Sequence, residues 1–322
     1  MKALPLAMFW LLGLIWGSSF IYMKMASELI SPSQIVLLRV LFGLLPIALY
    51  AHAMGALKWT HARHLGHFLV MAVIGTIAYY YGFARGSALL LSGVAGALSG
   101  LTPILSFLLA LLILREEKVS ATRMAGIAIG FLGVLAIARP FNEDIATTNL
   151  EGVFFNMIGS AGVGASFVYA KKYLMPLGIP ASALITYQLG LSLLILGVAI
   201  DLDGIGNIWS DVYVAAGLVL GLGVVGTGVA YIIYYFIIDR LGAVSAASAA
   251  YIPPVVALAI GVVLVGENVD QWEYAGAALI LAGVILVNRK TAASGTSQRD
   301  LPTPDEGIHL DSRVEPGNPR RN

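Results

Sequence analysis

The sequence predicts an all-α polytopic membrane protein in which ten transmembrane helices form two inverted five-helix repeats. Three observations support this: the apolar composition, ten apolar segments with polar breaks between them, and motifs that recur about 150 residues apart. Apolar residues make up 58% of the 322 residues and charged residues 11%, against roughly 45–50% and about 25% in soluble domains. A soluble core cannot enclose that much apolar surface, so we expect lipid to cover it.

The composition also argues against several classes of function. The net charge of +1 argues against nucleic acid as a partner. The chain has no cysteine, which excludes disulfides, thiolate catalysis and cysteine-ligated metal sites. No histidine lies deep in an apolar segment, and the embedded serines have no embedded lysine beside them. We therefore expect no enzyme activity, no catalytic residue and no cofactor.

Most of the ten apolar segments approach the ~20 residues needed to cross a bilayer. They cover residues 3–23, 33–53, 65–84, 87–114, 123–139, 150–170, 180–200, 212–237, 242–265 and 272–288. The first begins near Met1 and has no convincing cleavage site after Trp16-Gly17-Ser18-Ser19, so we expect a retained helix rather than a signal peptide. The fifth and tenth are the short ones and occupy equivalent places. Residues 291–322, with four prolines and mixed charges, are expected to form a disordered cytoplasmic tail.

The two predicted repeats, 3–139 and 150–288, share motifs in the same order. Leu114-Arg-Glu-Glu-Lys-Val119 returns as Leu264-Val-Gly-Glu-Asn-Val269, and each copy begins 11 residues after a proline, Pro103 or Pro253. Because each half contains an odd number of spans, the second half enters the membrane upside down. Inverted repeats with interrupted helices near the midplane are typical of secondary transporters.

The distribution of lysine and arginine predicts the orientation. With the N-terminus inside, eleven of these residues lie on the inner side and three, Lys24, Arg85 and Arg139, on the outer side. This bias follows the positive-inside rule and places both termini in the cytoplasm, with the chain in the inner (plasma) membrane.

Further motifs run through both halves of the chain. They are Trp16-Gly17-Ser18-Ser19-Phe20, Arg39, Gly75-Thr76, Ser99-Gly-Leu-Thr-Pro103, Gly226-Thr227, Tyr251-Ile-Pro253 and Gly266-Glu267. On these residues the chain, from 3 to 290, resembles the ten-helix exporters of the drug/metabolite transporter superfamily, the EamA-like group. The resemblance implies a basket of helices around a central cavity, with the fifth and tenth helices peripheral. It leaves the substrate open among amino acids, amines, vitamins, nucleotide-like metabolites and drugs.

The two repeated prolines indicate where the helices are interrupted. Pro103 and Pro253 fall near the middles of their segments, where each removes a backbone N–H and crowds the carbonyl four residues back. Irregular backbone at that depth lines a cavity or is buried in protein, and in transporters it often marks the binding site. The alternative is a kink that only shapes packing.

Aromatic and hydroxyl side chains would line a cavity suited to a small amphipathic molecule with a flat or apolar part. The predicted substrate-binding residues are Trp16, Ser19, Arg39, Tyr79, Ser99, Thr102, Phe167, Tyr187, Tyr231, Ser248 and Tyr251. The alternative is that the same hydroxyls form hydrogen bonds between neighbouring helices.

Arg39 is the clear charge inside an apolar run. It would either hold a substrate carboxylate by a forked hydrogen bond or serve the structure by capping carbonyls or snorkelling. We favour the structural role, because the resemblance places an arginine here across varied substrates. No Asp or Glu lies in mid-membrane, and Glu117 and Glu267 lie at segment ends, where they can cap or pair with a nearby arginine. This argues against a cation–proton antiporter and favours a facilitator or exchanger of neutral or zwitterionic solutes.

His61, His64 and His67 recur every three residues in the inner loop, among Lys58, Trp59 and Arg63. They resemble an interfacial segment more than a metal site, so no metal is predicted.

The sequence thus predicts a transporter that exports or exchanges small amphipathic metabolites, foremost amino acids and among them aromatic ones, by alternating access. A multidrug or vitamin or nucleotide-like metabolite carrier of the same fold is the alternative. A channel or an intramembrane enzyme is disfavoured, since a channel would show charged or carbonyl rings around a pore. The expected partners are the small-molecule substrate and the lipid bilayer, with the chain a monomer or weak homodimer.

Overall fold

The computed structural model describes residues 3–114, 120–138, 149–241 and 248–288. Every regular element within these ranges is a helix. The predicted tail at 291–322 lies outside the described residues, as does Glu117.

Among the described residues, eight helical spans are long and apolar enough to cross a membrane, and two shorter apolar helices accompany them. The eight spans are Ala3–Ala26, Pro32–Ala53, Trp59–Leu89, Ser92–Ile113, Ala121–Ala138, Leu150–Leu177, Ala181–Ala199 and Val212–Leu241; the shorter helices are Ala249–Val265 and Gln271–Val287. The prediction of an all-α polytopic membrane protein is confirmed. The fifth segment, expected to be short, is among the eight, and the third extends beyond residue 84 to Leu89.

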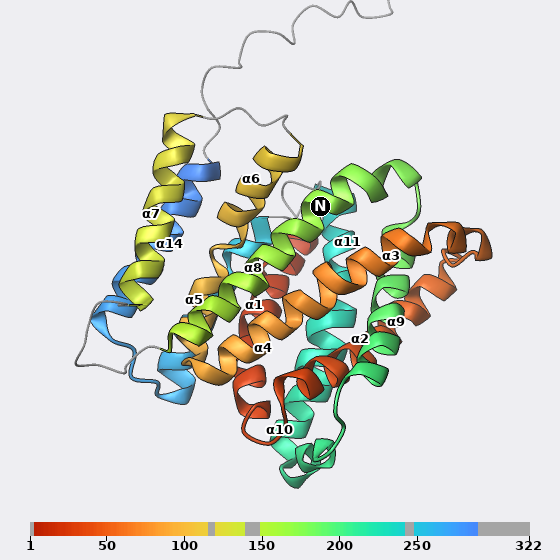
Figure 1. Ribbon diagram of the computed structural model, residues 1–322, viewed down its shortest axis with the longest axis horizontal. Coiled ribbons are helices and arrows are strands. Elements are labelled where there is room, and N and C mark those ends of the chain that lie inside the picture. Colours follow the sequence, from red (N-terminus) through yellow and green to blue (C-terminus); the bar gives the residue numbers. More distant parts are fainter. Residues whose placement is uncertain (1–2, 115–119, 139–148, 242–247, 289–322) are drawn as a thin grey trace, which may run out of the picture. The chain divides into compact units, whose positions relative to one another are not determined.

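Four spans are single helices and the others are composite (Figure 1). The single helices are α1 (Ala3–Ala26), α2 (Pro32–Ala53), α7 (Ala121–Ala138) and α9 (Ala181–Ala199). The third span joins η1 (Trp59–His64), α3 (Leu65–Ala72), η2 (Val73–Ala78) and α4 (Tyr79–Leu89); the fourth joins α5 (Ser92–Ser99) and α6 (Thr102–Ile113). The sixth joins α8 (Leu150–Tyr169), η3 (Ala170–Leu174) and η4 (Met175–Leu177). The eighth, after η5 (Ile205–Ser210), joins α10 (Val212–Ala216), η6 (Gly217–Val229) and α11 (Ala230–Leu241). The last helices are η7 (Ala249–Tyr251), α13 (Pro253–Ala259), η8 (Ile260–Val265) and α14 (Gln271–Asn288).

The start of α2 shows how local sequence fixes a span. Ser31 and Gln34 form a capping box: the Gln34 N–H donates to Ser31 Oγ at 3.4 Å, and the Ser31 N–H donates to Gln34 Oε1 at 3.0 Å. Pro32 occupies the first helical turn, where its missing N–H is not needed. Gln34 Nε2 also donates to the carbonyls of Asp201 and Asp203, at 3.0 and 2.8 Å. The cap therefore ties α2 to the loop that follows α9.

The apolar run predicted at 87–114 is two helices with a break, rather than one kinked helix. After α5, the N–H groups of Gly100 and Leu101 bond to the carbonyls three residues back, and α6 then begins with Pro103 in its first turn. Pro253 likewise begins α13, directly after η7 and Ile252. In a first turn a proline removes no intrahelical hydrogen bond, so these prolines begin helices.

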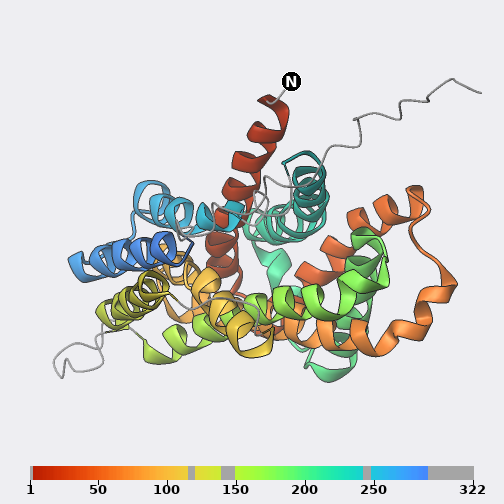
Figure 2. The same cartoon turned by 90° about the horizontal axis from the view of Figure 1, so that it is seen from above.

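Two pairs of glycines hold α7 against α14. A Cβ on Gly126 would lie 2.7 Å from the Gly283 carbonyl oxygen, and one on Gly133 would lie 2.6 Å from that of Gly276. Only glycine permits this approach of the backbones. The two helices run side by side in both views (Figures 1 and 2).

Helices from the two halves pack closely on one another elsewhere as well. α1 contacts α4 and α5 of the first half and η6, α11 and α13 of the second. Figure 2 shows its N-terminal part beside α11 and α13. α2 packs on η6, and α9 packs on α3 and η2. Helices of the two halves therefore share a buried hydrophobic cluster.

Candidate functional site

Arg39 is buried in α2 among uncharged partners. Its Nε donates to Thr227 Oγ1 at 3.0 Å, and its Nη1 lies 3.9 Å from the Met23 sulfur. The guanidinium carbon lies 3.8 Å from the ring centre of Tyr80. Within the described residues no carboxylate pairs with Arg39, although its residue is only 3% exposed. The site therefore holds a positive charge that is hydrogen-bonded but not neutralised.

A second polar pair, between Gln188 and Thr76, consists of the residues equivalent in the repeat to Arg39 and Thr227. Gln188 of α9 donates through Nε2 to Thr76 Oγ1 at 2.8 Å and to the Gly75 carbonyl at 3.0 Å. Gln188 lies 149 positions after Arg39, and Thr227 lies 151 positions after Thr76. Each half thus supplies the long polar side chain of one pair and the threonine of the other.

Both threonines lie in π-helical segments, Thr76 in η2 and Thr227 in η6. The Thr227 hydroxyl donates to the Leu222 carbonyl, five residues back, at 3.0 Å. Its remaining lone pairs are then available to accept from Arg39. π-Helical turns are rare and often occur at functional sites.

Tyrosines surround the guanidinium. The rings of Tyr79 and Tyr80 have centres 4.4 Å apart, and Tyr79 also meets Phe83 edge-on at 5.4 Å. Tyr79 and Tyr231 both pack against the buried cluster that contains Tyr80. Three of the predicted site residues, Arg39, Tyr79 and Tyr231, are therefore brought together.

Ser99 and Thr102, predicted near the break, both take part in hydrogen bonds within their own helices. Ser99 Oγ donates to the Gly96 carbonyl at 2.6 Å, and the Thr102 carbonyl accepts from Ser106 Oγ at 2.7 Å. Both Ser99 and Thr102 are buried. They flank the turn that precedes Pro103, so they lie at the interruption of the fourth span.

On α1, the predicted residues Trp16 and Ser19 face the second half. The Trp16 ring lies 5.8 Å from that of Tyr234, centre to centre. Ser19 is buried, donates to the Ile15 carbonyl at 3.2 Å and lies next to Gly226 of η6. These two residues join α1 to the eighth span.

The remaining predicted residues lie in other surroundings. Phe167 is 43% exposed on α8. Ser248 and Tyr251 are half-buried just before Pro253, and each has an interaction partner.

Tyr187 of α9 holds the loop that begins at Lys58. Its hydroxyl accepts from the Lys58 N–H at 3.1 Å, lies 3.2 Å from the Lys58 carbonyl and contacts His61 Nδ1 at 3.2 Å. Its ring stacks on Phe68 with the centres 5.0 Å apart. These contacts account for its polar group without a ligand.

The histidines between Lys58 and Phe68 make pairwise contacts. His67 Nδ1 lies 2.8 Å from the Tyr169 hydroxyl, and His64 Nε2 accepts from Arg63 Nε at 2.9 Å. In the part of the chain that the structure describes, no group of three His, Cys, Asp or Glu side chains is placed to hold a metal.

Glu267 joins the two halves in a way that the sequence analysis left open. Its Oε1 accepts from the N–H and the hydroxyl of Ser92, both at 2.7 Å, and its Oε2 accepts from the Gly93 N–H at 2.9 Å. It therefore caps the N-terminus of α5 and does not use an arginine partner for this role. The recurrence of Gly266-Glu267 marked the residue as repeated, but its partner lies 175 positions away.

Gln188, Thr76 and Thr227 were also missed as a set. The Gly-Thr motif and the position of Gln188 opposite Arg39 in the repeat were visible in the sequence. That signal pairs equivalent residues of the two halves. It does not show that the contacts run between non-equivalent ones.

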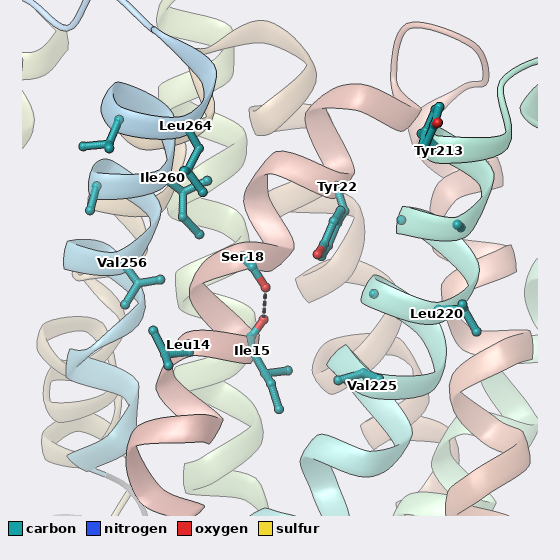
Figure 3. A pocket seen from close by; sticks show the side chains of 15 residues that line it. Leu14, Ile15, Ser18, Tyr22, Tyr213, Leu220, Val225, Val256, Ile260 and Leu264 are labelled. Atoms are coloured by element: carbon teal, nitrogen blue, oxygen red, sulfur yellow. Dashed lines mark hydrogen bonds between the residues drawn. The ribbon is translucent and has the colours of Figure 1, made fainter. Parts of the chain in front are cut away.

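An apolar groove of about 920 Å³ lies between α1, η6 and the α13–η8 segment (Figure 3). Leu14 and Ile15 of α1, Leu220 and Val225 of η6, and Val256 and Ile260 opposite them line its walls; Leu264 and Tyr213 lie toward one end. Tyr22 leans over Gly217 and Gly221, where an added Cβ would come within 2.9 and 2.5 Å of its ring. Ser18 donates to the Ile15 carbonyl at 2.9 Å, so its polarity is satisfied. The groove is therefore suited to an apolar ligand.

Comparison with known proteins identifies the family of the chain. A model of the EamA-like transporter family matches the chain twice, at residues 4–139 and 150–289. An uncharacterized transporter of Archaeoglobus fulgidus is 25% identical over 278 residues, which cover 85% of this chain and 95% of that protein. An uncharacterized inner membrane transporter of Escherichia coli (strain K12) is 26% identical over 283 residues, which cover 85% and 87%.

Two further matches concern a named exporter and a solved fold. The "Probable terminal-alkyne amino-acid exporter" of Streptantibioticus cattleyicolor is 25% identical over 291 residues, which cover 90% of this chain and 94% of that protein. A crystal structure at 18% identity superposes with a TM-score of 0.57 over 92% of this chain and all of that one, a likeness of fold alone. Because the family model matches most of the sequence, in two copies, the chain belongs to the EamA-like transporter family.

Proposed function

We propose that this protein is a secondary transporter of an inner (plasma) membrane that exports or exchanges small amphipathic metabolites, foremost amino acids. Ten helices, five from each half in opposite orientations, would enclose the substrate, with both termini in the cytoplasm. The eight full-length spans and two shorter apolar helices found among the described residues support that number. Lys and Arg on the predicted inner side support the orientation.

Reciprocal contacts support a two-fold relation between the halves. The approach of Gly126 to Gly283 is answered by that of Gly133 to Gly276, and the Arg39–Thr227 bond is answered by Gln188–Thr76. In a two-fold arrangement every contact between two positions has such a partner. A pseudo-two-fold axis in the membrane plane is characteristic of inverted-repeat transporters.

Although the sequence favours a structural role for Arg39, its buried charge has no carboxylate partner within the described residues, and this observation carries the choice of substrate. A guanidinium with a hydroxyl, a thioether and a tyrosine face as neighbours attracts a carboxylate, and its planar fork can bond both oxygens. The rings of Tyr79 and Tyr80 beside it would pack on the apolar part of the same molecule. A zwitterion with an apolar or flat side chain combines these features.

The named relative points in the same direction. The Streptantibioticus protein is described as an exporter of an amino acid, and the match covers most of both chains. At 25% identity it supports the substrate class rather than a particular amino acid.

Alternating access would rock one half against the other at the level of Pro103 and Pro253. Glu267 of the second half binds the start of α5 in the first. A contact of this kind closes one membrane face and must loosen when that face opens.

Counterflow tests the proposal. The purified chain would be reconstituted in liposomes that contain unlabelled phenylalanine or threonine, and uptake of the labelled amino acid would be followed. We expect label to accumulate, and phenylalanine amide, which lacks the carboxylate, to compete poorly. Uptake no faster than in protein-free liposomes across a panel of amino acids would overturn amino-acid transport.

The groove of Figure 3 favours a second candidate, an apolar drug or vitamin that enters from the bilayer. Such a substrate would compete with no need for a carboxylate. Counterflow with neutral apolar compounds, in the same liposomes, separates the two candidates.

A further inference from the structure

We propose that a second groove, between α2, the η1–α3 segment and α9, binds an anionic phospholipid. One acyl chain would lie in the groove, and the phosphate would lie at Lys58 and Arg63. This site is built from different side chains from those around Arg39, so the proposal does not depend on the transported substrate.

The groove has the length and lining of an acyl-chain site. Its volume is about 690 Å³, and apolar side chains line most of it, among them Leu44, Leu65, Phe68, Leu191 and Leu194. It follows α9 from Thr186 to Leu194, a rise of about 12 Å at ~1.5 Å per residue. Leu65 is 53% and Leu194 68% exposed, so the groove opens on the lipid-facing surface.

Gly190 leaves part of the groove empty. A Cβ built on it would meet no atom within 4 Å. A side chain at this position would therefore project into the space that we assign to the lipid tail.

The polar end of the groove carries positive charge without negative charge. Lys58 lines the groove and Arg63 follows one turn later; both are exposed. Within the described residues neither makes an ion pair. Residues 32–89 and 152–200, which supply every groove-lining side chain, contain no Asp or Glu. The end is thus complementary to a phosphate group.

The loop backbone is already fixed, which leaves the Lys58 amine for a ligand. Tyr187 bonds the Lys58 N–H and approaches its carbonyl. Arg63 Nε donates to His64 Nε2, which leaves the Nη1 and Nη2 donors of its guanidinium for a ligand.

Trp59 supports a lipid rather than a soluble phosphate. It is 93% exposed and lines the groove next to Lys58. Exposed tryptophans of membrane proteins lie at the level of the headgroups, so the cations beside it reach phosphates of the bilayer. Basic pockets between spans on the cytoplasmic side bind anionic headgroups in this way.

Native mass spectrometry of the full-length, delipidated chain tests the charge end. The protein would be given equal amounts of phosphatidylglycerol and phosphatidylcholine with identical chains. We expect phosphatidylglycerol to be retained preferentially, and that preference to fall about fivefold for each of Lys58→Gln and Arg63→Gln. Arg240→Gln, which removes an exposed cation on another helix, should leave it unchanged. Equal retention of both lipids, or an equal loss in Arg240→Gln, would overturn the proposal.

A second pair of variants tests the apolar end. Gly190→Phe should reduce retention of phosphatidylglycerol. Gly197→Phe, on the same helix, also meets no atom at its Cβ but does not line the groove, and it should bind like the wild type. Glycerol 3-phosphate should not displace the lipid. Displacement by this soluble headgroup, or unchanged retention in a well-folded Gly190→Phe, would rule out a lipid-tail site.

Discussion

Arg39 is bonded to groups that hold its position without cancelling its charge. Removal of one member of a buried ion pair strands the other charge, which is strongly destabilising. Here the neighbours are neutral, and Thr227 keeps its bond to the Leu222 carbonyl when the arginine is lost. A neutral residue at this position should therefore reduce the stability of the fold less than it reduces the binding of a substrate carboxylate.

We predict that Arg39→Gln reduces counterflow of amino acids about tenfold or more, because a hydrogen bond to a charged group contributes ~1.5–3 kcal/mol. Discrimination between phenylalanine and its amide should be lost as well. Arg85→Gln, which breaks the half-exposed pair with Glu151, is the control and should alter neither quantity. Full discrimination in Arg39→Gln would assign Arg39 a purely structural role.

Glu267, unlike Arg39, should contribute to stability, because its carboxylate accepts three hydrogen bonds at the start of α5. In Glu267→Gln one oxygen becomes an NH₂ group, which leaves a backbone donor unsatisfied at a cost of ~1–3 kcal/mol. We predict a lower unfolding temperature in detergent. Glu151→Gln, at an exposed surface pair worth ~0–1 kcal/mol, should change it little. Equal unfolding temperatures of both variants would contradict a role for the cap in stability.

At the scale of elements, hydropathy predicted most of the helices that are long and apolar enough to cross a membrane, because a span must satisfy its backbone internally and face lipid with apolar residues. The same signal does not show where a span changes its winding. η2 and η6 look like continuous apolar helix in sequence, yet both are π-helical and hold Thr76 and Thr227. Their register depends on packing against α9 and α2, which no local pattern encodes.

The breaks before α6 and α13 are elements that we expect to matter for transport. Pro103→Ala restores an N–H that can bond the Ser99 carbonyl, so α5 and α6 can merge into one helix. Pro253→Ala restores the N–H at its own position but relieves the second break only in part, because Pro254 follows it. We predict that both variants insert normally, with stability changed by less than about 1 kcal/mol, but exchange substrate more slowly.

Pro176→Ala is the matched control, since Pro176 is exposed in the first turn of η4. Membrane insertion, measured by yield and monodispersity, and counterflow would be compared for the three variants. If insertion and transport fall together in Pro103→Ala and Pro253→Ala, the breaks serve packing alone.

At the scale of the whole molecule, the repeat was legible in the sequence but its contacts were not. Offsets near 150 identify equivalent residues such as Arg39 and Gln188. Under the proposed two-fold relation each of them would lie against the other half, and the hydroxyl that accepts from Arg39 Nε is that of Thr227 in the second half. Glu267 illustrates the same limit, because the sequence left open whether it caps a helix or pairs with an arginine, and the helix start that it caps lies 175 positions away. Only the three-dimensional placement of the spans decides such pairings.

The distribution of carboxylates over the molecule leads to a last prediction. Within the described residues the buried acidic side chain is Glu273, in the first turn of α14, where it accepts from the Asp270 N–H at 2.8 Å. Within the described residues no carboxylate pairs with Arg39, and proton-coupled transport usually requires a membrane-embedded carboxylate. We therefore expect counterflow of phenylalanine to run at the same rate with equal pH on both sides, with a pH gradient, and with the gradient collapsed by a protonophore. A rate that disappears with the gradient would instead make an edge carboxylate such as Glu267 the coupling group, and the transport rate of Glu267→Gln would then become insensitive to the gradient.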